Sequence, residues 1–221
     1  MKKSVLFCSV LPTLAGSIAT AGVVDLRDLP NNFDQSSWGH PDTTMYAQSV
    51  QATDVFLDEF RFRATSTSVG GINYTLIVTG ARADIGGLGW APDLTDIRYE
   101  SAVSNIDGSG IMNEAVFNPN INVANGELLF FVLNTYTVGP TGVGTVRATE
   151  FNGPDQYLPG EFVFLNTGGP GSSLNDLVGA DWSHRFDNGE DLAIFASFSV
   201  PTPGTLFLLG AGALAGTRRR R

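Results

Sequence analysis

Short runs in which apolar and polar residues alternate are the feature that most limits how this chain can fold. In 59-EFRFRA-64 an apolar residue occupies every second position, and a charged residue precedes each of them. The run 72-INYTLIV-78 likewise places Ile72, Tyr74, Leu76 and Val78 on one side. A period of two is that of a strand buried on one face. Because no stretch shows a sustained 3.6-residue period, the chain is expected to fold into strands.

Glycine-rich and proline-rich breaks separate the apolar runs. The run 128-LLFFVL-133 is apolar at every position, which predicts a central strand covered on both faces. One helical turn is expected near Leu174 to Val178. Further strands are predicted at 44–50, 97–103, 111–117, 127–137, 145–151, 161–166 and 191–199. About nine strands joined by such turns predict an all-β fold, a single antiparallel β-sandwich of jelly-roll type.

The first 21 residues have the layout of a secretory signal peptide. Two lysines precede an apolar stretch, and the small residues Ala19 and Ala21 mark a cleavage site after Ala21. The stretch contains Cys8, the one cysteine of the chain. The mature protein is therefore expected to lack disulfides and thiolate metal sites.

The last residues combine an uncharged segment with a basic end. The segment 204–217 has fourteen residues, which as a helix would rise about 21 Å, against a hydrocarbon core of about 30 Å. We expect a short hydrophobic transmembrane helix that holds the chain only transiently in the inner membrane, with its basic end on the cytoplasmic side. Pro201 and Pro203 keep the preceding residues extended, a shape that a protease or transpeptidase can bind.

This tail resembles the PEP-CTERM sorting signal of Gram-negative bacteria. The residues that carry the resemblance are, in order, the motif Val200, Pro201, Thr202 and Pro203, the apolar run, and the basic cluster Arg218, Arg219, Arg220 and Arg221. In that family a Val-Pro-Glu-Pro motif is processed by a membrane transpeptidase, exosortase, and the proteins belong to surface and exopolysaccharide-associated systems. Thr202 stands where the family usually has glutamate. The resemblance implies exosortase as a partner and the cell surface or extracellular matrix as the destination.

Charge excludes some partners. The segment 22–199 carries seven arginines against twenty-two carboxylates, a net charge of −15. Such a surface repels nucleic acid and anionic lipid, because phosphate binding needs clustered cations. We predict no nucleic-acid partner.

Few residues are available for catalysis. His40 and His184 are the only imidazoles, and no nucleophile elbow or metalloprotease motif is present. The paired carboxylates 58-DE-59, or Asp93 with Asp96, could act as acid and base on a sugar, but chance pairs are expected among so many acids. We predict a noncatalytic protein without a cofactor, and keep a small secreted polysaccharide-active hydrolase as the alternative.

Three loops could supply oxygen ligands to calcium: 105-NIDGSG-110, 152-NGPDQ-156 and 187-DNGED-191. None follows an EF-hand template, and Asx and Gly residues also form ordinary turns. We predict no metal site and leave calcium open.

Tryptophan side chains are the candidates for glycan contact. Trp90 is the strongest, because 86-GGLGWAPD-93 reads as a loop that would hold the indole near solvent. Trp38 and Trp182 are further candidates, although tryptophan in a β-sandwich is more often buried.

The sequence thus divides into a signal peptide (1–21), a β-sandwich domain (22–199) and a sorting signal (200–221). We expect an exported surface or matrix protein, associated with exopolysaccharide and capable of weak glycan binding.

Overall fold

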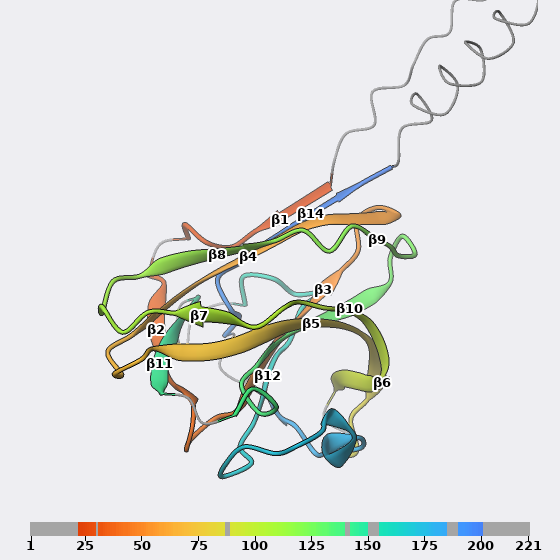
Figure 1. Cartoon of the computed structure of the whole chain (residues 1–221). Coiled ribbons are helices and arrows are strands. Elements are labelled where there is room, and N and C mark those ends of the chain that lie inside the picture. Colours follow the sequence, from red (N-terminus) through yellow and green to blue (C-terminus); the bar gives the residue numbers. More distant parts are fainter. Residues whose placement is uncertain are drawn as a thin grey trace, which may run out of the picture.

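The computed structural model describes residues 22–29, 31–86, 89–139, 142–149, 155–184 and 190–200. These residues form two antiparallel β-sheets that face each other, without an α-helix (Figure 1). The predicted all-β, sandwich-like fold is therefore confirmed. The predicted signal peptide and the predicted C-terminal helix lie outside the described residues.

Sheet A is centred on its longest strand, β4. Its members are β1 (Gly22–Asp25), β2 (Phe33–Gly39), β4 (Phe56–Ser66), β8 (Asn113–Phe117), β9 (Ile121–Asn122), β11 (Val143–Ala148) and β14 (Ile194–Ser199). The strand order is β1-β14-β4-β11-β2. Phe60 of β4 pairs with both Ala196 and Phe117, so β8 lies along the edge of β4 opposite to β14.

Sheet B is built around β10. Its members are β3 (Met45–Gln51), β5 (Ile72–Ala83), β6 (Trp90–Glu100), β7 (Ser104–Ile106), β10 (Leu128–Asn134), β12 (Phe162–Leu165) and β13 (Ser183–His184). The order is β13-β12-β3-β10-β5-β6, and β7 pairs with β5. The expected helical turn is present as a 3-10 helix, η1 (Leu174–Leu177).

Alternating residues of the two sheets meet in the main core. Phe60, Phe62 and Ala64 of β4 are fully buried, as their alternation predicts. The Phe60 ring stacks on Phe131 of β10, with ring centroids 4.2 Å apart. The 72, 74, 76 and 78 positions of β5 enter the same core. The two periodic runs therefore lie with the predicted faces inward.

The predicted central position of 128-LLFFVL-133 is confirmed, because β10 lies between β3 and β5. Phe130 and Val132 point away from the main core into a second apolar cluster. The segment 166–182 covers this cluster and contributes Leu177 and Trp182 to it. Gly171 lets the segment approach closely, since a Cβ there would lie 1.9 Å from the Tyr136 ring.

The sequence prediction missed several strands and misplaced one. β1, β2, β7, β9 and β13 were not predicted. β2 escapes a search for alternation because a register shift interrupts its pairing with β11, and Ser37 has a positive φ of 73°. β6 begins at Trp90, not at residue 97. The prediction of a loop over 86–93 is therefore wrong from Trp90 onward.

The two ends of the described body lie side by side. β1 and β14 are antiparallel, with Gly22 opposite Phe198 and Val24 opposite Ala196. Figure 1 shows β1 beginning and β14 ending at the same end of sheet A, while η1 lies at the opposite end of the molecule. Gly22 and Ser199, the first and last residues of the predicted sandwich domain, therefore lie at the same end of sheet A.

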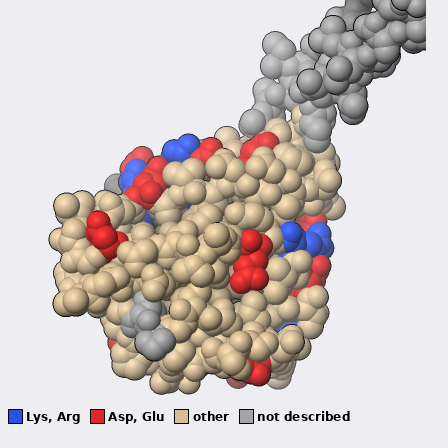
Figure 2. Space-filling view, viewed as in Figure 1, with Lys and Arg blue, Asp and Glu red and all other residues tan. Residues whose placement is uncertain are grey.

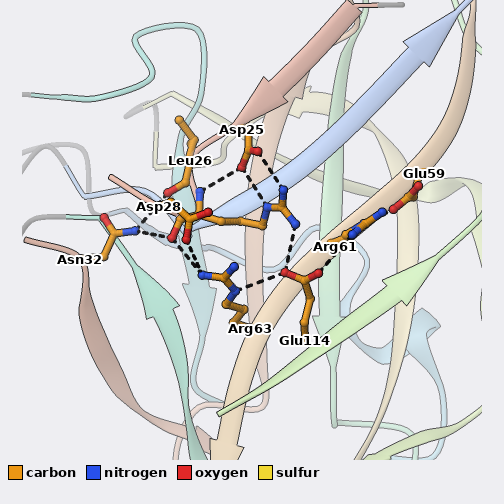
Figure 3. Close-up of polar contacts among 9 residues, drawn as sticks. Asp25, Leu26, Asp28, Asn32, Glu59, Arg61, Arg63 and Glu114 are labelled. Carbon is orange, nitrogen blue, oxygen red and sulfur yellow. Dashed lines mark hydrogen bonds and ion pairs between the residues drawn. The ribbon is translucent and has the colours of Figure 1, made fainter. Parts of the chain in front are cut away.

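The outer face of sheet A carries a network of ion pairs. Glu114 of β8 contacts three guanidinium groups, those of Arg27, Arg61 and Arg63 (Figure 3). Asp25, Asp28 and Glu59 complete the network. Arg27 and Arg61 also lie over the Phe195 ring, 4.6 and 5.2 Å from its centroid. On the face drawn in Figure 2, groups of arginine atoms lie beside carboxylates on a mostly uncharged surface.

Candidate functional site

The three tryptophans occupy different environments. Trp38 is fully buried between Tyr74 and Phe62, and its Nε1–H donates to the Leu133 carbonyl at 3.2 Å. Trp182 is 2% exposed. Their ring faces are covered by protein, so the prediction that Trp38 and Trp182 contact glycan is wrong. Trp90 is 48% exposed, which leaves it as the one predicted tryptophan that a sugar can reach.

Glu161, the residue before β12, lies directly beside Trp90. The Trp90 main-chain N–H donates to Glu161 Oε2 at 3.0 Å. Gly89 makes this approach possible, because a Cβ at that position would lie 2.7 Å from the same oxygen. Two hydrogen bonds fix the main chain of Glu161 to Ser49 of β3. The Glu161 N–H donates to the Ser49 hydroxyl, and the Ser49 N–H donates to the Glu161 carbonyl. The carboxylate is therefore held at the main chain of the residue that carries the exposed indole.

A buried histidine lies on the inner side of this carboxylate. His184 of β13 is 2% exposed at its side chain, and its Nδ1 lies 3.5 Å from Glu161 Oε2. Its Nε2 lies 3.3 Å from Oδ2 of Asp84, the residue after β5. The order from the surface inward is therefore Trp90, Glu161, His184 and Asp84.

Asp84 is the innermost member, with a fully buried side chain. Burial by itself would raise its pKa, but hydrogen bonds from His184 and from the Trp182 and Gly86 N–H groups outweigh that effect and lower the pKa of Asp84. A carboxylate kept ionised in this way fixes the orientation of the imidazole next to it.

The chemistry of the arrangement follows from which groups a ligand can reach. His184 and Asp84 are too deeply buried to contact a ligand, so they act as positioning residues. Glu161 is one-fifth exposed, and Trp90 is about half exposed. Ile85 and Val178, 66% and 46% exposed, add apolar surface around the β5–β6 turn. The site offers an aromatic face, a fixed carboxylate and an apolar rim.

The other acid–base candidates are engaged in ordinary structure. Asp58 accepts a hydrogen bond from the Ser199 hydroxyl, and Glu59 pairs with Arg61. Asp93 caps a turn through Thr95, whereas Asp96 pairs with Arg98. Neither sequence pair therefore forms an isolated pair of carboxylates.

The second predicted histidine is also structural. His40 is 8% exposed, and its Nε2 lies 2.8 Å from the Thr135 carbonyl. It occupies the loop between β2 and β3, where it ties that loop to the residue after β10.

Among the described residues, no group of three or more His, Cys, Asp or Glu side chains could hold a metal ion. The structure does bring two of the three candidate calcium loops together, at Asp155 and Asp191. Asp191 is buried and accepts a hydrogen bond from Gln48 at 2.7 Å. Burial, reinforced by the charge of Asp155, raises the pKa of Asp191 to about 7.

Two members of the site were not found from the sequence. Asp84 and Glu161 belong to no motif, and they lie 100 and 23 positions from His184 along the chain. Only the pairing of sheet B and the closure of β13 beside the β5–β6 turn bring them together. His184 was noted as one of the two imidazoles, but nothing in the sequence pairs it with Asp84 or Glu161.

The structure also bears on membrane segments. Within the part of the chain that is described, no helix has the length and apolar content needed to cross a membrane. The segment predicted to do so, 204–217, lies outside that part.

No family model matches the chain, and no curated protein matches it. Among solved structures, a chain from the structure of the infectious bursal disease virus Gx strain matches with a TM-score of 0.30 and 11% identity. The match covers 90% of this chain and 42% of the viral chain. At this TM-score the similarity supports no conclusion about function.

Proposed function

We propose that this protein is an exported, noncatalytic surface or extracellular-matrix protein that associates with exopolysaccharide through weak glycan contact at Trp90 and Glu161. Sorting and processing through the C-terminal tail deliver it to the cell surface. One observation supports the glycan contact: Trp90 is about half exposed, and its main-chain N–H holds the Glu161 carboxylate.

The pair suits a sugar because its two parts match the two kinds of sugar surface. The C–H face of a pyranose packs on an aromatic ring, and a neighbouring carboxylate accepts hydrogen bonds from the hydroxyl groups. Glu161 needs little reorganisation to do so, since the Trp90 N–H already holds Oε2. A site without a deep pocket is expected to bind weakly, and to gain strength through repeated contact with a polymer.

The positions of the two ends agree with tethering by the tail. If cleavage follows Ala21 and the motif begins at Val200, both processing sites adjoin the β1–β14 pair. The β5–β6 turn lies against the residues that follow η1, since a Cβ on Gly179 would lie 3.7 Å from Ile85. This turn therefore belongs to the end of the molecule opposite to the β1–β14 ends (Figure 1). A chain held at the membrane by its tail would present Trp90 outward.

The proposed architecture is a jelly roll. The order β2-β11-β4-β8 in one sheet and β3-β10-β5-β6 in the other supports it, because successive members of this set alternate between the sheets except at the β5–β6 hairpin, as two Greek keys require. In this description β1, β7, β9, β12, β13 and β14 are additions.

A polysaccharide panel tests the function. The purified protein should be retained by at least one exopolysaccharide without producing new reducing ends, and Trp90→Ala should lose this retention. Val116→Ala, at an exposed position of sheet A, is the control and should be retained like the wild type. Retention that survives Trp90→Ala would contradict the site.

The alternative function, a polysaccharide-active hydrolase, is favoured by one observation. Glu161 lies beside a buried histidine and a second carboxylate, an arrangement that can tune a general acid. If the same panel yields new reducing ends that disappear in Glu161→Gln, the protein is an enzyme and the noncatalytic proposal is wrong.

A further inference from the structure

We infer that the glycan bound at Trp90 and Glu161 carries protonated amino groups, so that the ligand class is a polysaccharide of N-deacetylated amino sugars. This inference rests on the proposed glycan contact and specifies its chemistry.

The first argument is the capacity of the Glu161 carboxylate to accept hydrogen bonds. Its Oε2 receives the Trp90 N–H at 3.0 Å and faces His184 Nδ1 at 3.5 Å. The side chain is one-fifth exposed. A carboxylate has two oxygens that accept hydrogen bonds, so Glu161 can accept a further one from a donor that comes from solution. An ammonium group satisfies such an oxygen with a charge-assisted hydrogen bond, which is stronger than a bond from a hydroxyl group.

The second argument is the exposed aromatic ring of Trp90, the residue whose main-chain N–H contacts Glu161. Trp90 is 48% exposed, and the indole is the side chain that attracts a cation most strongly through its ring face. A neutral sugar ring can pack on the indole, but it gains neither the cation–π attraction nor the ion pair with Glu161. An amino sugar gains both, because its ammonium group is attached directly to the ring that packs.

The third argument is the charge of the surroundings. Asp181 is exposed next to the β5–β6 turn, with Oδ1 3.0 Å from the Cβ position of Gly86. Arg82, the last arginine of β5, is already held by protein oxygens, because it donates to the Ala180 carbonyl and its Nη1 lies 3.9 Å from buried Asp84. The described charges around the turn are therefore the carboxylates Glu161 and Asp181 and one guanidinium that is already engaged.

The net charge of the domain, −15 over residues 22–199, extends this preference over a longer range. A uronate-containing or sulfated polysaccharide would be repelled, and a polycationic one would be attracted. Net charge alone would attract any polycation, however, so the experiment must separate the site from the overall field.

The probes are four oligosaccharides of equal length. They are N-acetylglucosamine and glucosamine oligomers joined by the same linkage, a glucose oligomer, and a galacturonate oligomer. Isothermal titration calorimetry with the purified full-length protein at pH 6 and low salt should give glucosamine binding about tenfold tighter than N-acetylglucosamine binding, as one added charge-assisted contact predicts. Added salt should reduce this ratio.

Two isosteric variants carry the same change in net charge. Glu161→Gln should bring the glucosamine and N-acetylglucosamine affinities to within about twofold, because the amide still accepts the Trp90 N–H but attracts no cation. Asp107→Asn should keep the wild-type ratio, because Asp107 follows β7 beside the start of β5, whereas Trp90 pairs with the end of β5. Trp90→Ala should lose both ligands.

The outcomes separate the two proposals. Equal affinity for the acetylated and deacetylated oligomers, or tighter binding of galacturonate, would overturn the inference and leave the glycan contact standing. Equal loss in Glu161→Gln and Asp107→Asn would show attraction by net charge alone and would also overturn the inference. Absence of binding to any probe polysaccharide or oligomer would overturn both. If Glu161→Gln does not fold, Trp90→Ala gives the second reading, since it keeps the net charge: glucosamine binding that survives in this variant at wild-type strength would show attraction by net charge alone and would overturn the inference.

Discussion

The outer faces of the two sheets differ, although both sheets share one core. The outer face of sheet A carries the ion-pair network around Glu114, in contact with solvent. The outer face of sheet B is covered by the segment 166–182, which buries Phe130, Val132 and Trp182 in a second apolar cluster. The covered face is also where the candidate site arises, since the end of the covering segment leads into β13 and His184.

This difference shows that the sequence of a strand depends on what packs against each of its two faces. β4 alternates because one face meets the core and the other meets water. β10 is apolar throughout because a loop, distant in sequence, covers its second face. Alternation of apolar and polar residues thus predicts that one face of the strand meets solvent. A strand that is apolar throughout predicts that another segment covers its second face, but its own sequence does not show which segment.

The largest expected effect comes from removing the anchor of the covered face. Trp182→Ala should lower the free energy of unfolding by about 3–5 kcal/mol, because a large buried side chain is lost and a cavity remains. Urea denaturation followed by circular dichroism measures the change.

The matched control for that substitution is Trp90→Ala, which removes the same side chain from a half-exposed position. Its effect should stay within about 0.5 kcal/mol. Equal losses for the two variants would show that the segment 166–182 does not protect sheet B as described.

The second effect compares a buried charge with the exposed charges of sheet A. The folded-state pKa of Asp191 is raised to about 7, from an ordinary value of 3.8. Both states are protonated at low pH, so burial is not penalised there. As the pH rises from about 4 to about 7, the unfolded state ionises first, and the free energy of unfolding should fall by at most about 1.4 kcal/mol per pH unit.

Asp191→Asn should remove this dependence, leaving a protein that equals the wild type near pH 4 and exceeds it in stability at pH 8. Urea titrations at several pH values measure the difference, and Asp107→Asn serves as the control with an exposed carboxylate. A variant that loses stability at pH 8 would mean that the charged form of Asp191 is the one the fold requires.

The smallest effect is expected on the open face. Glu114→Gln should cost about 1 kcal/mol at low salt and less at high salt, because exposed ion pairs contribute little and are screened. Thermal unfolding at two ionic strengths measures the effect. A loss as large as that of Trp182→Ala would remove the contrast between the two faces.

Local pattern was enough for the parts of the fold with regular period. It located β4, β5 and the central β10, because their burial follows from nearest neighbours in sequence. It missed β2, whose pairing is interrupted by a register shift, and β13, whose two residues are too short for a pattern. The glycines before Trp90 also led to the prediction of a loop over 86–93 that is too long, since β6 begins at Trp90.

The residues of the site likewise divide into one that local sequence pattern predicts and others that only tertiary contacts bring together. Trp90 was predicted because exposure at the edge of a glycine-rich turn is a local property. Asp84, Glu161 and His184 form a unit only through tertiary contacts, and burial of Trp38 and Trp182 depends on the same contacts. Residue type identified the candidates, and sheet pairing decided which of them a ligand can reach.

Intact-mass spectrometry of the protein recovered from its native cell surface tests the central claim, that the chain is exported and then sorted by its tail. We predict a species that begins near Gly22 and ends near Pro203. A surface species that retains Met1 or Arg221, or a full-length chain found only in the cytosol, would contradict it.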